Sequence, residues 1–223
     1  MNVTILQFPG TNCEFDTKYA FERLGQDVTI LWHEEELVPA NTDLVVIPGG
    51  FSYGDYLRSG AIARFSPVMK AVRAYADNGG YVLGICNGFQ ILLESHLLPG
   101  AMKRNENLHF ISQYHYLKVE NSENRFLSEC KAGEILNIPI AHAEGNYFIE
   151  EDGLKRLYDN GQVLLTYCDK DGNPQNPNGS IDNIAGICNK EKNVFGLMPH
   201  PERAMETILG SIDGVRMLEG FIS

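Results

Sequence analysis

Cys86 lies in a sequence setting that is typical of a nucleophile. It stands between Gly84 and Gly88, directly after the apolar residues 81–83, a pattern that predicts a strand turning sharply into a helix with the thiol at the apex, the cysteine form of a nucleophile elbow. The dipole at the start of that helix favours the thiolate form. A cysteine at a strand end is more often a small buried hydrophobe, but the paired glycines favour the nucleophilic interpretation.

A nucleophilic thiol needs a base, and His200 is the candidate. It lies between two prolines, just after an expected strand over 194–198. Pro201 favours an extended conformation at His200, and side chains at i and i+2 of an extended chain share a face. Glu202 can then bind one imidazole nitrogen while the other faces Cys86. Alone, His200 fits a surface turn equally well and Glu202 a solvated carboxylate, but together they predict a triad.

A second glycine-rich turn suggests where a developing negative charge is bound. Gly49 and Gly50 follow the apolar residues 44–47, and glycines let backbone amides approach a substrate closely. We expect the amides of Gly50 and Asn87 to form an oxyanion hole; losing one such donor typically costs about 3–4 kcal/mol of transition-state stabilisation. Taken alone, two glycines after a strand usually make only a turn.

The elements that must position these residues alternate between strand and helix. Strands are expected over 3–7, 28–31, 44–47 and 81–85, and helices over 15–24, 61–77 and 89–96. Thr11 and Glu14 have the spacing of a capping box before the first helix. This order predicts an α/β fold with an open, mostly parallel sheet flanked by helices and with ligands at the carboxyl ends of the strands.

The second half of the chain changes character. Residues 108–163 predict a small antiparallel, strand-rich excursion, and the turn-forming residues 169–180 predict a surface loop. Strands over 184–188 and 194–198 and a closing helix over 211–221 complete the expected elements. No linker separates two units, so we expect a single domain over 1–223.

Composition limits the partners and the compartment. The 223 residues carry 18 Lys and Arg against 29 Asp and Glu, a formal net charge of −11, which opposes nonspecific binding to nucleic acid or to anionic membranes. The N-terminus lacks the pattern of a signal peptide and no stretch is apolar enough to span a bilayer, so a cytoplasmic protein is expected. Five dispersed cysteines without a C-x-x-C pair predict free thiols and no metal site.

These motifs resemble those of class I, triad-type glutamine amidotransferases. The class resemblance is carried by Gly84-Ile85-Cys86-Asn87-Gly88-Phe89-Gln90 and Pro199-His200-Pro201-Glu202. Over its whole length the chain is similar to glutaminase subunits that serve an ATP-dependent synthetase of purine synthesis. That likeness is carried by residues 8–14, 48–64, 141–145 and 176–180.

The resemblance implies a role for each site residue. Cys86 would be the nucleophile that forms a γ-glutamyl thioester, His200 the general base and then acid, and Glu202 the group that orients His200. Gln90 would contact the substrate, L-glutamine. The products would be glutamate and ammonia.

The resemblance also implies a division of labour between subunits. Ammonia would pass to a larger synthetase subunit that converts formylglycinamide ribonucleotide to formylglycinamidine ribonucleotide. No cofactor is expected in this chain, which lacks a P-loop motif; ATP and Mg are expected on the synthetase partner. Whether a third small subunit is required stays open.

Several residues and two other functions also stay open. Asp55, Arg58, Arg64, His142 and Glu144 lie in the motifs without an assigned role, and the α-amino and α-carboxylate partners of glutamine are not assigned. Cys13 reads as incidental. The alternatives are a stand-alone cysteine hydrolase of γ-glutamyl or peptide bonds on the same fold, and a catalytically silent subunit, for which an intact triad gives no reason.

Overall fold

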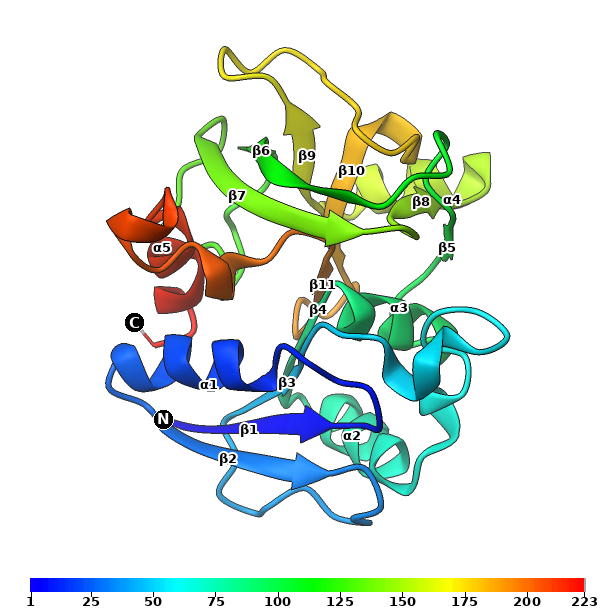
Figure 1. Ribbon diagram of the computed structural model, residues 1–223, viewed down its shortest axis with the longest axis vertical. Helices are drawn as coiled ribbons and strands as arrows, with labels where there is room; N and C mark the ends of the chain where they lie inside the picture. Colours follow the sequence, from blue (N-terminus) through cyan, green and yellow to red (C-terminus); the bar gives the residue numbers. More distant parts are fainter. Residues whose placement is uncertain (223) are drawn as a thin grey trace.

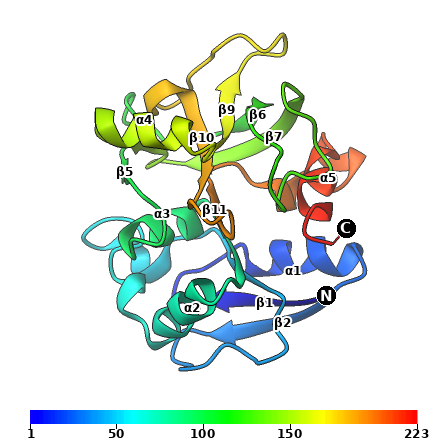
Figure 2. The ribbon, with the colours of Figure 1, turned by 180° about the vertical axis from the view of Figure 1, so that it is seen from behind.

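The computed structural model describes residues 1–222, which build a large mixed sheet with helices on both faces (Figures 1 and 2). Its strands are β1 (Asn2–Gln7), β2 (Asp27–Trp32), β3 (Leu44–Ile47), β4 (Tyr81–Ile85), β6 (Ile111–Val119), β7 (Ile135–His142), β9 (Val163–Cys168), β10 (Ile184–Cys188) and β11 (Val194–Leu197). They form a nine-stranded sheet in the order β2-β1-β3-β4-β11-β10-β9-β6-β7. A separate ribbon pairs β5 (Ala101–Lys103) with β8 (Asn146–Phe148).

The first five strands of this order form the parallel half of the sheet. Strands β2, β1, β3, β4 and β11 pair in parallel. Every residue of β3 is buried, as expected for an apolar strand covered on both faces. Their carboxyl ends lie along one edge, where the candidate residues follow β3, β4 and β11. The expected α/β sheet is confirmed.

The antiparallel half continues the same sheet. From β11 the pairing runs antiparallel through β10, β9, β6 and β7, so the strand-rich excursion extends the sheet. The predicted loop over 169–180 contains no helix or strand.

One helix was missed within the excursion, α4 (Glu151–Asp159). It is short and charged, with only Gly153 and Leu157 buried, so its apolar pattern is too sparse to distinguish it from a turn.

Four further helices cover the sheet: α1 (Glu14–Arg23), α2 (Pro67–Asp77), α3 (Asn87–Glu94) and α5 (Asp213–Glu219). Helix α1 lies on one face, and α2 and α3 lie on the other (Figures 1 and 2). Helix α2 buries Val68, Met69, Val72 and Ala76, a spacing that forms one apolar stripe.

Two local predictions were wrong. The helix expected over 61–77 begins only at Pro67, because the residue before a proline avoids helical geometry: Ser66 is extended, with φ −61° and ψ 145°. The capping box does not form either. Thr11 Oγ1 accepts the Phe8 amide at 3.0 Å, and the Glu14 carboxylate accepts the Gln7 side-chain amide at 2.8 Å. Thr11 and Glu14 therefore bind residues that precede α1, and neither side chain caps the helix.

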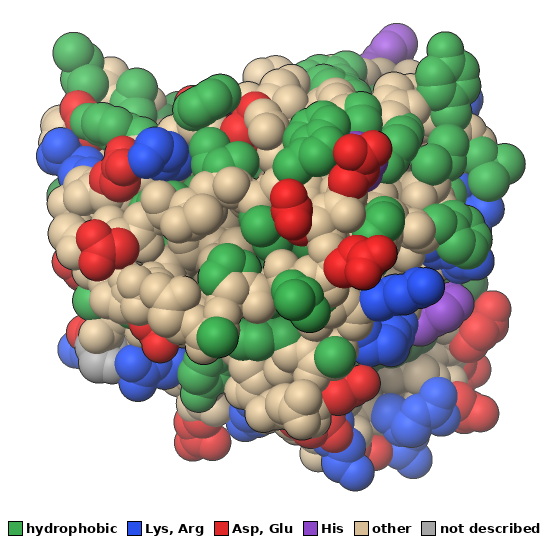
Figure 3. Space-filling view, turned by 90° about the horizontal axis from the view of Figure 1, so that it is seen from below, with side chains coloured by type: hydrophobic (Ala, Val, Ile, Leu, Met, Phe, Trp, Pro, Cys, Tyr) green, Lys and Arg blue, Asp and Glu red, His purple; other side chains and the backbone are tan. Residues whose placement is uncertain are grey.

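The surface carries charges of both signs. Figure 3 shows acidic and basic side chains interspersed with hydrophobic ones on the lower face of the molecule. Among residues 1–222, no helix combines the length and the apolar character needed to cross a bilayer.

The start of α3 packs so closely on β3 that Gly88 tolerates no side chain. A Cβ at Gly88 would lie 1.8 Å from the carbonyl oxygen of Ile47. We expect Gly88→Ala to lower the free energy of unfolding by about 2–4 kcal/mol through this clash, measured by urea denaturation. Gly79→Ala is the control: its space is open and its φ is +86°, so it should cost only the roughly 1–2 kcal/mol of a left-handed backbone. Equal losses for both variants would contradict the close packing.

Candidate active site

Cys86 sits on a strained turn between β4 and α3. Its φ is 51° and its ψ is −105°, a conformation that costs a non-glycine residue on the order of 1–3 kcal/mol. The flanking glycines are required sterically: a Cβ at Gly84 would lie 2.7 Å from the Gly88 backbone. The predicted elbow is therefore present, and it holds the buried thiol at the carboxyl edge of the parallel half-sheet.

The pairing of β4 with β11 brings His200 to this turn. Ile85 stands opposite Leu197 in the parallel register, and the Cys86 amide donates to the Leu197 carbonyl at 2.8 Å. Three residues beyond Leu197, the His200 amide is held by the Pro139 carbonyl of β7 at 2.8 Å. Sequence-distant segments therefore meet because two parallel strands are neighbours.

His200 and Glu202 form a buried pair. Nδ1 of His200 lies 2.6 Å from Oε1 of Glu202, and both side chains are almost inaccessible. The contact is made by a tight 3-10 turn over Pro201–Arg203. The prediction that an extended i, i+2 arrangement aligns the two side chains was thus wrong in its geometry, because Pro201 starts a turn. The other imidazole nitrogen, Nε2, has no hydrogen-bond partner among residues 1–222.

The surroundings of His200 favour its protonated form. Burial by itself lowers the pKa of His200, but the Glu202 carboxylate, the Cys86 sulfur and a hydrogen bond with Cys13 outweigh burial and raise that pKa well above its ordinary value. A buried imidazolium is stabilised only where an opposite charge is in contact with it. The pair is thus suited to take up a proton from a neighbouring group.

The turn after β3 carries Gly50 and binds the start of α3 through the Ser52 amide and Asn87 Oδ1. Gly50 has φ +146°, and a Cβ there would lie 2.7 Å from the Asn12 amide, so the close approach of two backbone segments requires glycine. Neither the Gly50 amide nor the Asn87 amide donates a hydrogen bond within residues 1–222. The Asn87 amide is one of the free first-turn donors of α3. Both amides are therefore unengaged, and their role as an oxyanion hole stays a prediction.

Side chains on α3 tie this turn to the helix. Asn87 Oδ1 accepts the Ser52 amide at 3.1 Å, and Asn87 Nδ2 donates to Gln90 Oε1 at 2.9 Å. Gln90 Nε2 donates in turn to the Glu144 carbonyl at 2.6 Å. Gln90 therefore lies at the site with both ends of its amide held by the protein, and its contact with substrate stays a prediction.

Residues 141–145, a motif that the sequence left without an assigned role, form a wall of the site. The Cys86 thiol lies 3.6 Å from the Ala141 carbonyl oxygen. The wall is held by Asn105, a fully buried residue whose amide donates to the His142 carbonyl at 2.9 Å and whose Oδ1 accepts the Gly145 amide at 3.0 Å. Nothing around Asn105 in the sequence signals this role, because its partners come from β7 and the turn after it.

The unassigned charged residues separate into two groups. Arg58 and Arg64 both pair with Glu94 at the end of α3, so they brace the loop against the helix. Asp55 lies closer to the site: its Oδ1 is 3.5 Å from Asn87 Nδ2. Burial, with a further contribution from the Glu144 charge, raises the pKa of Asp55 to about 6. The Glu144 carboxylate accepts the Ser59 hydroxyl at 2.8 Å.

Comparison with known proteins identifies the class. The model of a family described as the CobB/CobQ-like glutamine amidotransferase domain matches residues 1–215, and the chain belongs to this family of glutamine amidotransferases. Within it, the chain groups with PurQ subunits of phosphoribosylformylglycinamidine synthase. It is 69% identical over 222 residues to that subunit of Sulfurimonas denitrificans, covering 100% of this chain and 99% of the relative. To that of Wolinella succinogenes it is 64% identical over 220 residues, covering 99% of each.

A solved structure supports the same grouping. A chain in the structure of PurLQS from Thermotoga maritima superposes with a TM-score of 0.90 at 38% sequence identity, covering 99% of this chain and 97% of that chain. The fold described above, with its parallel half, its antiparallel extension and its elbow, is therefore that of the family over nearly the whole chain.

The buried ring of His142 predicts a pH-dependent loss of stability. Burial, followed by repulsion from His200, lowers the pKa of His142 to about 4 from an ordinary 6.5. As pH falls below about 6.5 the unfolded chain takes up a proton that the native ring refuses, so stability falls with pH. Between about pH 7 and about pH 5 we expect this residue to cost the wild type about 2 kcal/mol.

His142→Gln supplies the matched comparison, because it keeps a polar side chain without a titratable ring. Urea denaturation at both pH values should show a smaller pH-dependent loss for His142→Gln than for the wild type. The same loss in both proteins would show that His142 is not held neutral by the fold.

Proposed function

We propose that this chain is the glutaminase subunit of a phosphoribosylformylglycinamidine synthase and that it hydrolyses L-glutamine to glutamate and ammonia on Cys86. The observation that carries the proposal is the buried His200–Glu202 pair, 2.6 Å between Nδ1 and Oε1, beside a thiol on a strained elbow. High identity to PurQ subunits over the full chain supports the choice of substrate and complex.

In the proposed mechanism, Nδ1 of His200 is engaged by Glu202, which leaves Nε2 to take the thiol proton of Cys86. The thiolate attacks the carbon of the side-chain amide of glutamine. The amides of Gly50 and Asn87 bind the oxygen that becomes negatively charged. Collapse of this intermediate breaks the C–N bond, and His200 returns its proton to the departing ammonia.

The thioester left on Cys86 is then hydrolysed. His200, neutral again, takes a proton from water, and the resulting hydroxide adds to the thioester carbonyl. The second intermediate binds the same two amides, and its collapse releases glutamate and the thiol. Glu202 keeps the ring oriented and stabilises the imidazolium formed in both halves of the reaction. In this proposal Gln90, on the same helix as the elbow, contacts the bound amino acid.

The proposed partner is a larger synthetase subunit that carries ATP and Mg and consumes the ammonia. It would convert formylglycinamide ribonucleotide to formylglycinamidine ribonucleotide in purine synthesis, with both subunits in the cytoplasm. The likeness to a chain of a PurLQS structure supports an assembly with further subunits, including a third small one.

Removing the thiol tests the assignment of the nucleophile. Reconstituted with the synthetase, Cys86→Ala should lose glutamine-dependent product formation to background, because no thioester can form. Synthesis driven by added ammonia should persist in the same preparation, since the synthetase does not need the thiol. Cys130→Ala, at another buried free cysteine, is the control and should retain glutamine-dependent synthesis. Survival of that synthesis in Cys86→Ala would refute the proposal, and turnover of γ-glutamyl peptides by the isolated wild-type chain would favour the stand-alone hydrolase.

Changing the orienting carboxylate tests the role of the pair. Glu202→Gln keeps the shape but loses the charge that holds the ring, so kcat for glutamine hydrolysis should fall roughly 10²–10⁴-fold. The KM for glutamine should change little, because Glu202 does not contact the substrate in this mechanism. Steady-state kinetics of the complex check both values. A rise in KM with kcat unchanged would place Glu202 in substrate binding and contradict the assigned role.

A further inference from the structure

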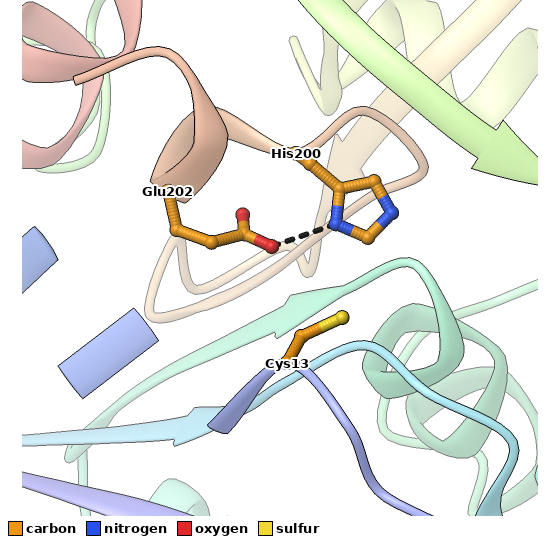
Figure 4. A group of neighbouring side chains, drawn as sticks. All are labelled: Cys13, His200 and Glu202. Carbon is orange, nitrogen blue, oxygen red and sulfur yellow. Dashed lines mark hydrogen bonds and ion pairs between the residues drawn. The ribbon is translucent and has the colours of Figure 1, made fainter. Parts of the chain in front are cut away.

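A second thiol lies against the imidazole of the candidate triad. Cys13 precedes α1, and its side chain points toward the ring of His200 (Figure 4). One ligand atom from each of Cys13, His200 and Glu202 lies within 4.8 Å of the other two, and all three residues are buried. Gly49 packs between these groups, since a Cβ there would lie 2.8 Å from His200 Cε1 and 3.0 Å from Cys13 Sγ.

Two buried polar atoms in this group have no hydrogen-bond partner. Within residues 1–222, His200 Nε2 and Glu202 Oε2 make no hydrogen bond, although their residues are only 1% and 2% exposed. A buried polar atom without a partner is costly and calls for an explanation. The proposed catalytic step uses Nε2 during turnover, but it uses neither Oε2 nor the Cys13 sulfur.

The three donors match the ligands of a thiophilic cation. Thiolate, imidazole and carboxylate are the ligand types of Zn²⁺, and three protein ligands with one open position form a common zinc site. Ligand atoms about 2.0–2.3 Å from a tetrahedral zinc ion lie about 3.3–3.8 Å apart. The 2.6 Å contact between His200 and Glu202 would have to open by about 1 Å. Separations of up to 4.8 Å among the three atoms would have to close by about the same amount.

We propose that Cys13, His200 and Glu202 form an inhibitory site for a thiophilic divalent cation such as Zn²⁺. On binding, the Cys13 thiol releases its proton to solvent, and the ring nitrogen of His200 that binds the cation gives up its proton to solvent or to the other ring nitrogen. The cation then takes a lone pair each from sulfur, imidazole and carboxylate. His200 can then neither accept the Cys86 proton nor be oriented by Glu202, so glutamine hydrolysis stops. This consequence rests on the proposed function, whereas cation binding does not.

The neighbouring charges are compatible with a cation. Arg203 donates to the Cys13 sulfur at 3.1 Å, but its guanidinium is paired with Asp16 at 3.1 Å, which offsets its charge. The Cys13 thiolate and the Glu202 carboxylate together balance a divalent ion. In the metal-free protein the Cys13 thiol donates a hydrogen bond to Asn12 Oδ1 at 3.1 Å.

The binding test uses Co²⁺ as a spectroscopic probe and needs no activity. In the Cys86→Ala chain, Co²⁺ should give the charge-transfer absorption of a thiolate ligand, and Zn²⁺ should displace it. Adding Cys13→Ser should abolish that absorption, while Cys130→Ser, at another buried free cysteine, should leave it intact. Absorption that survives in the Cys86→Ala, Cys13→Ser chain would overturn the proposal. Cys13→Ala, checked for folding by its thermal unfolding, provides the same comparison if the serine variant is unfolded.

The inhibition test uses the assembled complex, and each variant is compared with its own metal-free rate. Zn²⁺ should inhibit glutamine-dependent synthesis in the wild type, and a chelator should restore it. In Cys13→Ser the zinc concentration for half-inhibition should rise roughly 10–100-fold or more; in Cys130→Ser it should not change. Ammonia-dependent synthesis should resist zinc in all three. An unchanged half-inhibition in Cys13→Ser would refute the site, whereas absent glutamine hydrolysis in the metal-free wild type would instead refute the proposed function.

Discussion

The parallel pairing of β4 with β11 is the constraint on which the candidate site depends. It sets Ile85 opposite Leu197 and lets the Cys86 amide bond the Leu197 carbonyl. The chain leaves each strand at the same edge of the sheet, so the strained elbow and the proline-flanked histidine emerge side by side. A slip of this register would separate them, because each residue along a strand moves the exit point by about 3.3 Å.

Packing around this strand pair maintains the strained backbone of Cys86 and the burial of its thiol. The positive φ of Cys86 is retained because β3 and α3 press on the glycines that flank it. On the other side, Asn105 and the wall over residues 141–145 close over the thiol. The antiparallel half of the sheet thus contributes to the site by carrying β7, whose Pro139 carbonyl also positions His200. Strain and burial are tolerated where several elements impose them together.

The sequence predicted much of this and missed parts for identifiable reasons. The strands of the parallel half and the elbow at Cys86 were predicted because apolar runs and glycines act locally, and the contact of His200 with Glu202 was also predicted. The extended geometry predicted between His200 and Glu202 was wrong, because Pro201 starts a 3-10 turn. The capping box predicted at Thr11 and Glu14 was also wrong, because these side chains bind Phe8 and Gln7. Asn105 and α4 carried too little local signal to be recognised.

By itself, the sequence determined which groups can do chemistry and which short elements carry them, since residue types, glycines and prolines act over a few positions. Only the tertiary structure decided which of those groups meet. The sequence marked Cys13 as incidental, yet its sulfur lies within 4.8 Å of a ring nitrogen of His200. Arg58 and Arg64 lie in a prominent motif, but they pair with Glu94. The physical reason is that contact across a sheet depends on strand order and register, which arise from the packing of the whole chain.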